Sequence, residues 1–145
     1  MNEIAHIQEL MDRIGRAAKD AAWELTTAST KSKNTALSAA AKALRRNQNL
    51  IISENAKDIA FAKDLDLSGS MLDRLALDED RIEAIAKGLE QIVALPDPVG
   101  VATNTWDRPN GLKIERRRTP IGGIGVIYES RPNVTADAGA LCLKA

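Results

Sequence analysis

The sequence changes character at one place, the stretch Leu95-Pro96-Asp97-Pro98. Before it, apolar residues recur every three or four positions, which is the period of a helix with one buried face. After it, glycines, prolines and β-branched residues appear, and the apolar period shortens toward that of a strand. Proline lacks a backbone N–H and disfavours a helical residue before it, so the two prolines end the helical part. We therefore predict an α/β chain whose helical part covers residues 1–98.

Helix boundaries in that part follow from capping residues and from breaks in the apolar stripe. Ser29, Thr30 and Ser32 provide capping groups before an alanine-rich helix, and Asp78 is well placed to cap the last helix. Asn47 and Asn49 interrupt the pattern, and Ser68 to Ser70 has the composition of a loop. The predicted helices cover residues 4–25, 34–46, 51–64 and 82–93, with a short helical turn after residue 70.

Two strands are predicted directly after the prolines, from Val99 to Trp106 and from Leu112 to Thr119. They are joined by Asp107 to Gly111, whose final Asn110-Gly111 pair supplies the positive φ angles that hairpin turns require. The run Glu115 to Thr119 is rich in arginine. On a strand its side chains alternate between two faces, which favours a solvated or edge-protecting strand over a basic patch.

A third strand is predicted from Ile121 to Tyr128, because its nearly continuous apolar character is typical of a strand covered on both faces. A helix from Val134 to Ala145 follows it, with Asn133 as its N-cap. A buried parallel strand that ends in a polar turn and enters a helix places that turn at the ligand-binding edge of an open α/β sheet. The turn is Tyr128-Glu129-Ser130-Arg131-Pro132-Asn133.

Composition excludes several classes of function. The 145 residues contain 20 basic and 20 acidic side chains, so no strongly basic surface for nucleic acid is expected. Aromatic residues are scarce, which disfavours stacking on single-stranded nucleic acid. The N-terminus lacks the apolar core of a signal peptide, and no apolar run reaches the roughly 18 residues of a membrane span. Together with a single cysteine, this predicts a soluble, cytoplasmic protein.

Three glycines near the third strand invite comparison with a phosphate-binding loop. They are Gly122, Gly123 and Gly125, and the third position of a dinucleotide fingerprint starting at Gly123 is occupied by Tyr128. They also precede the strand, whereas the fingerprint lies between a strand and a helix. We expect them instead to let the backbone pass closely at the start of the strand.

Asn133 has two interpretations that its local sequence leaves open. As a structural residue it caps the following helix, which the local pattern favours because asparagine is among the commonest caps. As a chemical residue its amide donates a hydrogen bond to a developing oxyanion. Arg131 is similarly open, since it could pair with Glu129 or contact an anionic substrate.

Neither a self-sufficient catalytic set nor a metal site is predicted. Cys142 lies between Leu141 and Leu143 on a predicted helix, with no histidine nearby in the sequence. Reactive cysteines need electropositive and accessible surroundings, so we expect a buried, inert thiol. His6 is the only histidine, and no group of His, Cys and carboxylates has metal-ligand spacing.

Four stretches together resemble a known family: "SGSMLDRLAL", "LPDPVG", "GLKIERRRTPIGGIGVIYESRPNVT" and "ALCLK". They are similar to the glutamate-5-semialdehyde dehydrogenase (γ-glutamyl phosphate reductase) family of proline biosynthesis, part of the aldehyde dehydrogenase superfamily. The resemblance runs from the first helix to the last residue, as in an N-terminal fragment. The superfamily usually has tryptophan before the asparagine of this turn, where this chain has Pro132.

The resemblance implies roles for the residues of the turn. Asn133 becomes the catalytic oxyanion donor, and Ser130, Arg131 and Pro132 become residues along the bound cofactor, NADP(H). The implied reaction is the NADPH-dependent reduction of L-glutamyl 5-phosphate to L-glutamate 5-semialdehyde and phosphate through a cysteine thioester. The nucleophilic cysteine is expected downstream of residue 145, so the fragment itself is expected to be inactive.

The resemblance also implies an organisation and partners. Residues 1–98 would be the helical part of the cofactor-binding domain, and residues 99–119 a hairpin that joins subunits of a homo-oligomer. Residues 120–145 would contribute the first strand of a Rossmann-like parallel sheet, the active-site turn and a crossover helix. Functional coupling to glutamate 5-kinase is expected as well, whereas a nucleic acid, a membrane or a metal is not.

Two other hypotheses account for part of the sequence. A non-catalytic helical interaction module explains the apolar stripes and the missing nucleophile, but not a buried strand that ends in Arg-Pro-Asn. An acyl-reducing relative that uses a coenzyme A thioester differs only in the acyl donor. A downstream cysteine in a glycine-bearing context would distinguish the enzymes from the module.

Overall fold

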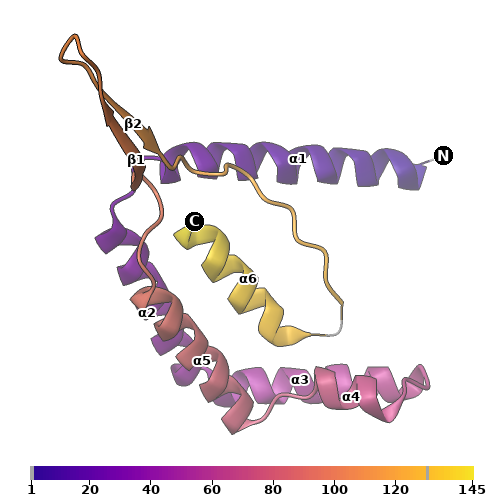
Figure 1. The fold of residues 1–145 in the computed structure, drawn as a ribbon. Helices are drawn as coiled ribbons and strands as arrows, with labels where there is room; N and C mark the ends of the chain where they lie inside the picture. Colours follow the sequence, from indigo (N-terminus) through magenta and orange to yellow (C-terminus); the bar gives the residue numbers. More distant parts are fainter. Residues whose placement is uncertain (1, 130) are drawn as a thin grey trace. The chain divides into compact units, whose positions relative to one another are not determined.

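A computed structural model describes residues 2–129 and 131–145, with side chains described from His6 onward (Figure 1). The described chain is mostly helical, with one two-stranded antiparallel sheet, so the predicted α/β class is confirmed. No helix in the described residues is both long and apolar enough to cross a lipid bilayer. The elements in chain order are α1 (Asn2–Leu25), α2 (Thr30–Arg46), α3 (Gln48–Asp64), α4 (Gly69–Leu75), α5 (Glu79–Ala94), β1 (Ala102–Asp107), β2 (Lys113–Arg117) and α6 (Pro132–Lys144).

The chain divides into two compact units. Unit 1 comprises Met1–Ser29, Pro96–Gly125 and Ala145, and therefore holds α1 and the hairpin. Unit 2 comprises Thr30–Leu95 and Val126–Lys144, and therefore holds α2 to α5 and α6.

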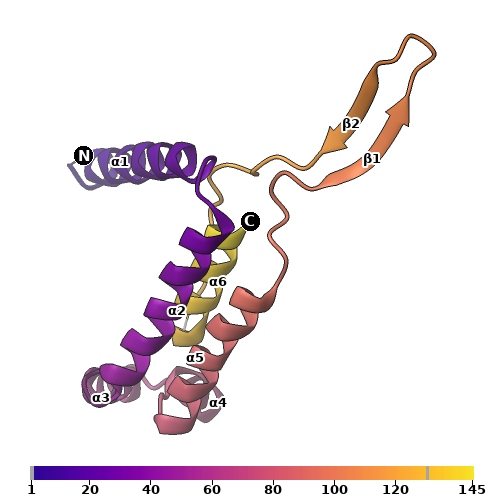
Figure 2. The same ribbon diagram turned by 90° about the vertical axis from the view of Figure 1, so that its left-hand side faces the viewer.

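Unit 2 contains the hydrophobic core of the described residues. Helices α2, α5 and α6 lie side by side in both views (Figures 1 and 2), and buried residues from all three form one cluster. Alanines at the centre of this packing are completely buried and let the helix backbones approach closely. The apolar stripes of the sequence thus identify the buried faces of α2 and α5. The core consists of Leu37, Ala41, Ala86, Leu89, Ile92 and Ala140.

The predicted capping and break signals are largely confirmed in unit 2. Asp78 is the N-cap of α5, and its Oδ1 accepts a hydrogen bond of 2.7 Å from the Arg81 backbone N–H. Asn47 alone separates α2 from α3, and its Nδ2 donates to the Ala43 carbonyl at 2.8 Å. Asn49 lies inside α3, so the predicted interruption is shorter than two asparagines suggest.

A buried asparagine holds the connection between α4 and α5 against α3. Asn55 Nδ2 donates to the Leu75 carbonyl at 3.0 Å, and its Oδ1 accepts from the Leu77 N–H at 2.7 Å. Asn55 is 6% exposed, and Leu75 and Leu77 are half-buried. One side chain therefore satisfies the donor and the acceptor of a turn that has no strand or helix partner.

Replacing Asn55 with alanine is expected to lower the free energy of unfolding by about 1–3 kcal/mol, because it removes both hydrogen-bond partners from the half-buried backbone groups of Leu75 and Leu77. Asn49→Ala is the matched control, since it makes the same change at an exposed position of the same helix. Denaturant midpoints measure both variants. Equal midpoints for the two would show that the Asn55 hydrogen bonds contribute nothing.

An arginine on α2 ties that helix to α5. Arg45 Nε lies 2.8 Å from Glu83 Oε2, and Arg45 Nη1 lies 2.5 Å from Glu90 Oε1. The hydrogen bonds from Arg45 hold the pKa values of both carboxyl groups below their usual range. Such groups stabilise the fold above their unfolded pKa, near 4.5, and that contribution is lost as the pH falls through the lower pKa of the folded state.

We expect Arg45→Met to flatten this acid dependence, because it removes the cation that lowers both pKa values. The melting temperature of the wild type should fall more steeply than that of the variant between about pH 5 and pH 3. Arg46→Met is the control, because Arg46 makes no ion pair in the described part of the chain. Parallel profiles for the wild type and Arg45→Met would refute the assignment.

Two buried lysines fix the C-terminal end of α6. Lys144 Nζ donates to the Val93 carbonyl at 3.2 Å and to Asn34 Oδ1, while Lys33 Nζ donates to the Lys144 carbonyl at 3.2 Å. Both lysines are only 3% exposed. These bonds connect the C-terminal end of α6 to α2 and α5.

Unit 1 contains the predicted hairpin. β1 and β2 pair antiparallel, with Thr105 opposite Glu115 and a register shift between Ala102 and Asn104. Gly111 takes the positive φ, +83°, in the connecting loop. Every residue of both strands is exposed, so the solvated character predicted for the arginine-rich strand is confirmed.

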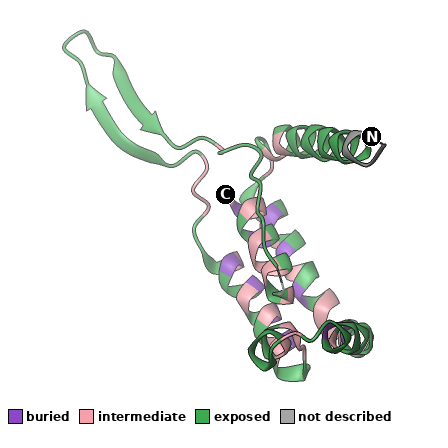
Figure 3. Ribbon diagram, turned by 90° about the vertical axis from the view of Figure 1, so that its right-hand side faces the viewer, coloured by how far each residue is buried: buried purple, intermediate pink, exposed green. Residues whose placement is uncertain are grey.

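Side chains on the two faces of the hairpin pair as the alternation predicts. Arg117 Nη2 lies 2.6 Å from Glu115 Oε2 on one face. The Arg116 guanidinium lies 5.9 Å from the centre of the Trp106 ring, within the range of a cation–π contact. No residue of unit 1 from His6 onward is buried (Figure 3).

The third predicted strand, Ile121 to Tyr128, is not formed. Its residues are in irregular conformation and exposed, with Ile127 103% and Ile121 73% exposed. A strand in a parallel sheet needs neighbours for its backbone N–H and C=O groups. No other described segment pairs with these residues, so the apolar pattern has no sheet to join.

Candidate functional site

The start of α6 corrects the prediction for Asn133. The helix begins at Pro132, and the Val134 N–H donates to the Arg131 carbonyl at 3.0 Å. Proline favours the first helical position because its φ is already helical and its missing N–H would have no partner in the helix. Asn133 is therefore the second residue of the helix and not its cap, so the structural interpretation that the local pattern favoured is wrong.

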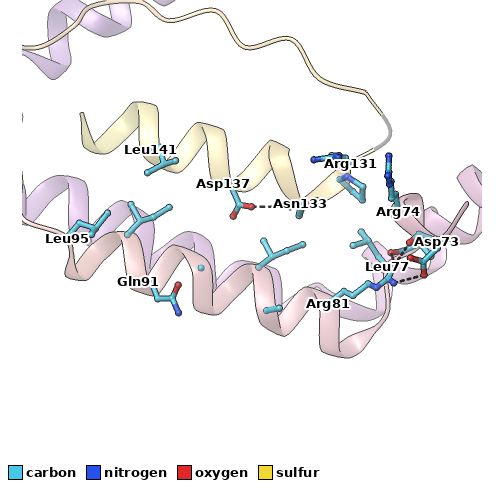
Figure 4. Close-up of a pocket in the computed structure, with 16 residues that line it drawn as sticks. Asp73, Arg74, Leu77, Arg81, Gln91, Leu95, Arg131, Asn133, Asp137 and Leu141 are labelled. Carbon is cyan, nitrogen blue, oxygen red and sulfur yellow. Dashed lines mark hydrogen bonds and ion pairs between the residues drawn. The ribbon is translucent and has the colours of Figure 1, made fainter. Parts of the chain in front are cut away.

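The Asn133 side chain instead lies along the first turn of α6. Its Nδ2 donates to Asp137 Oδ2 at 3.2 Å, and Figure 4 shows both side chains directed toward α5. Asn133 is exposed and Asp137 is half-buried. The amide is therefore anchored at one N–H and accessible to a ligand.

A second contact holds the two sides of the turn together. The Tyr128 hydroxyl and Thr135 Oγ1 are 2.8 Å apart, close enough for a hydrogen bond in which either group donates. This bond connects the peptide before the turn to the first turn of α6. Ser130 lies between them, outside the described residues.

Helices α4, α5 and α6 surround a cleft of about 800 Å³ within unit 2. Arg131, Pro132 and Asn133 line it together, so three of the four predicted site residues share one surface. Arg74 lies near Arg131 at the same end of the cleft (Figure 4). The lining is Asp73, Arg74, Ala76, Leu77, Arg81, Ala84, Ile85, Gly88, Gln91, Ile92, Leu95, Arg131, Pro132, Asn133, Asp137 and Leu141.

One wall of the cleft is fixed by Arg81. Its Nη2 lies 2.7 Å from Asp73 Oδ1, and its Nη1 donates to the Ala76 carbonyl at 2.8 Å and to the Asp73 carbonyl. The hydrogen bond with Asp73 raises the pKa of Arg81 further above its ordinary value. Arg81 thus connects α5 to the end of α4 and shapes the wall.

The chemistry at the α6 end of the cleft is that of hydrogen-bond donation to an oxygen bearing negative charge. The Asn133 side-chain amide and the guanidinium of Arg131 are donors. The helix adds a partial positive charge at its N-terminus. Such a set suits an oxyanion and provides neither a nucleophile nor a base.

Other sequence candidates are not among the residues that line this cleft. Cys142 is half-buried near the end of α6. Gly122, Gly123 and Gly125 line a groove of about 640 Å³ with α1 inside unit 1, where a Cβ on Gly123 would lie 4.0 Å from that of Ala18. No cluster of three His, Cys, Asp or Glu side chains suited to a metal occurs among the described residues.

Sequence reasoning missed two contacts of the site, Asn133 with Asp137 and Tyr128 with Thr135. Asp137 is four residues after Asn133, the spacing at which side chains meet on one helix face. The sequence predicts their contact once both residues are assigned to the helix. The Tyr128–Thr135 contact had no such signal, because it spans a turn whose geometry the sequence does not specify.

Comparison with known proteins gives matches over nearly the whole chain. The chain is 58% identical over 135 residues to gamma-glutamyl phosphate reductase of Parvibaculum lavamentivorans, which covers 93% of this chain and 32% of that relative. It is 57% identical over 144 residues to the reductase of Brucella anthropi, covering 99% of this chain and 33% of the relative. No family model matches the chain.

Solved structures match the fold as well. A crystal structure of gamma-glutamyl phosphate reductase from Thermotoga maritima has a TM-score of 0.86 and 40% identity, covering 89% of this chain and 31% of that one. The reductase from Saccharomyces cerevisiae has the same TM-score and 34% identity, covering 91% of this chain and 34% of its own. The chain thus spans about a third of the length of these proteins, and over that third it resembles gamma-glutamyl phosphate reductase in both sequence and fold.

Proposed function

We propose that this chain forms the N-terminal third of an NADPH-dependent reductase that converts L-glutamyl 5-phosphate to L-glutamate 5-semialdehyde and phosphate in proline biosynthesis. The observation that carries the proposal is the 57–58% identity to gamma-glutamyl phosphate reductases over 93–99% of the chain. The α6 end of the cleft supports it, because a set of donors without a nucleophile suits one part of a larger active site.

Asn133 acts as the oxyanion donor in this proposal. The acyl carbon passes through two tetrahedral oxyanions, one when a cysteine thiolate expels phosphate and one when hydride reaches the resulting thioester. A donor aimed at that oxygen strengthens its hydrogen bond as charge develops, which lowers both barriers. The cysteine comes from the part of the reductase outside these 145 residues, and the thiolate is released again when the aldehyde forms.

The residues before Asn133 fit the edge of a dinucleotide cofactor. Arg131 is exposed and lines the cleft. Pro132 lines it too, and its backbone has no N–H that a bound cofactor would have to pair with. The positive end of α6 suits an anionic cofactor. We assign Ser130, Arg131 and Pro132 to this contact, and NADP(H) supplies the hydride when it is bound.

The hairpin and the remaining context complete the proposal. β1 and β2 expose every residue, which suits a strand pair that adds to another subunit of a homo-oligomer. The reductase works in the cytoplasm and couples functionally to glutamate 5-kinase, because an acyl phosphate is short-lived in water. The same proposal divides the chain into three parts: a helical part of the cofactor-binding domain (residues 1–98), the oligomerisation hairpin (99–119) and the first strand, active-site turn and crossover helix (120–145).

The reverse reaction tests the function with stable reagents. The complete enzyme is supplied with glutamate 5-semialdehyde and NADP⁺, and formation of NADPH is followed with either phosphate or coenzyme A as the acyl acceptor. We expect NADPH to form only with phosphate. Activity with coenzyme A alone would assign the thioester-forming relative, and no activity with either would favour a non-catalytic module.

A further inference from the structure

We propose that Asp137 is a positioning residue for Asn133, whose carboxylate orients the amide so that one N–H is held and the other is free for the substrate oxygen. The inference rests on the proposed function and adds a residue to its active site. It begins with the 3.2 Å hydrogen bond from Asn133 Nδ2 to Asp137 Oδ2.

The chemistry of the two groups determines which end of the amide faces the carboxylate. An ionised carboxylate only accepts hydrogen bonds, whereas an asparagine amide has an NH₂ that donates and an oxygen that accepts. Turning the Asn133 amide by 180° would bring its oxygen against the carboxylate of Asp137, which is unfavourable. Asp137 thus selects one of two amide orientations, and an oxyanion donor works only when its N–H points to the substrate.

Asp137 lies against the neighbouring helix, α5. It is half-buried and faces α5 at Gly88, where an added Cβ would lie 3.4 Å from Asp137 Oδ1 (Figure 4). The carboxylate therefore approaches the α5 backbone at Gly88 to within about one van der Waals contact of where a Cβ would lie. The spacing of four residues on one helix places it beside Asn133 whenever α6 is formed.

The negative charge of Asp137 opposes catalysis, although its hydrogen bond to Asn133 favours it. A negative charge next to a developing oxyanion opposes its formation, so the carboxylate contributes through orientation and not through its field. An asparagine at position 137 retains an oxygen that accepts the same hydrogen bond and removes the charge. Orientation and charge are therefore separable by one substitution.

The test uses steady-state kinetics of the complete enzyme with phosphate, NADP⁺ and glutamate 5-semialdehyde. We expect Asp137→Ala to lower kcat by about 10- to 100-fold through misplacement of the amide, with KM for the semialdehyde changed less than about twofold. Asp137→Asn should keep kcat within about threefold of the wild type, since it preserves the acceptor. Melting temperatures establish that both variants fold.

A double-mutant cycle with Asn133→Ala separates this inference from the proposed function. Asp137→Ala should lower kcat in the wild type and have no further effect in Asn133→Ala, because the residue acts only through the amide. Additive effects would overturn the positioning role, as would loss of activity in Asp137→Asn with a raised KM, which indicates direct binding of the substrate's ammonium group. An Asn133→Ala enzyme with normal kcat would instead refute the proposed role of Asn133 itself.

Discussion

Replacing Asn133 with alanine in the complete enzyme is expected to lower kcat by about 10²–10³-fold, the usual loss when one oxyanion donor is removed. The melting temperature should change little, because Asn133 is exposed and does not cap α6. Its one described hydrogen bond joins neighbouring turns of the same helix. Steady-state turnover and thermal unfolding, measured on the same preparation, distinguish the two effects.

Asn49→Ala is the control for this prediction, since it removes an exposed asparagine from α3 far along the chain. It should leave both kcat and the melting temperature unchanged. A large fall in melting temperature for Asn133→Ala with normal turnover of the folded enzyme would make Asn133 a structural residue of the turn.

The largest effect on stability is expected for Ile82→Ala, which should lower the free energy of unfolding by about 2–5 kcal/mol. Ile82 is the largest fully buried side chain among the described residues, at 1% exposed, and it lies on α5. Truncation removes transfer free energy and leaves a cavity that the packed helices fill only in part. Denaturant unfolding of the variant and the wild type measures the difference.

Ile82→Val provides the graded comparison and should cost only about 0.5–1.5 kcal/mol, because it removes a single methyl group. The two variants keep the same backbone and differ only in the volume removed. Equal losses for valine and alanine would indicate that the cost does not come from a cavity, and that the position is not packed as described.

Helices and their boundaries were predictable because their signals are local. The stripe on α5, the cap at Asp78 and the stop at Pro96 each depend on residues within one or two turns. The hairpin was predictable for the same reason, since Gly111 supplies a positive φ between two strands that pair with each other. Local rules suffice when an element's partners are its neighbours in the sequence.

The strand from Ile121 to Tyr128 was not correctly predicted because its signal is not local. An apolar run indicates that a segment is suited to burial, but the burial and the backbone hydrogen bonds come from other strands. The described residues contain no such strands, and Ile127 is exposed instead. The same limit applies to the buried lysines, since the contact of Lys33 with Lys144 joins residues 111 positions apart.

The roles of the candidate site residues stay a prediction, but their placement can be compared with the structure. The resemblance identified Arg131, Pro132 and Asn133, and the structure places them together on one cleft. The cap assignment failed because two rules compete in this turn: asparagine favours the cap and proline favours the first helical position. Proline prevails here, since it shifts the helix start by one residue and frees the Asn133 side chain for Asp137.

The most direct measurement is a crystal structure of the complete enzyme acylated by L-glutamyl 5-phosphate without NADPH, so that the cysteine thioester accumulates. The distance from Asn133 Nδ2 to the thioester carbonyl oxygen is the quantity of interest. We predict a hydrogen bond of about 2.7–3.2 Å, with Asp137 still accepting from the same amide nitrogen. An Asn133 side chain that points into solvent, with the thioester oxygen bound by other groups, would contradict the account.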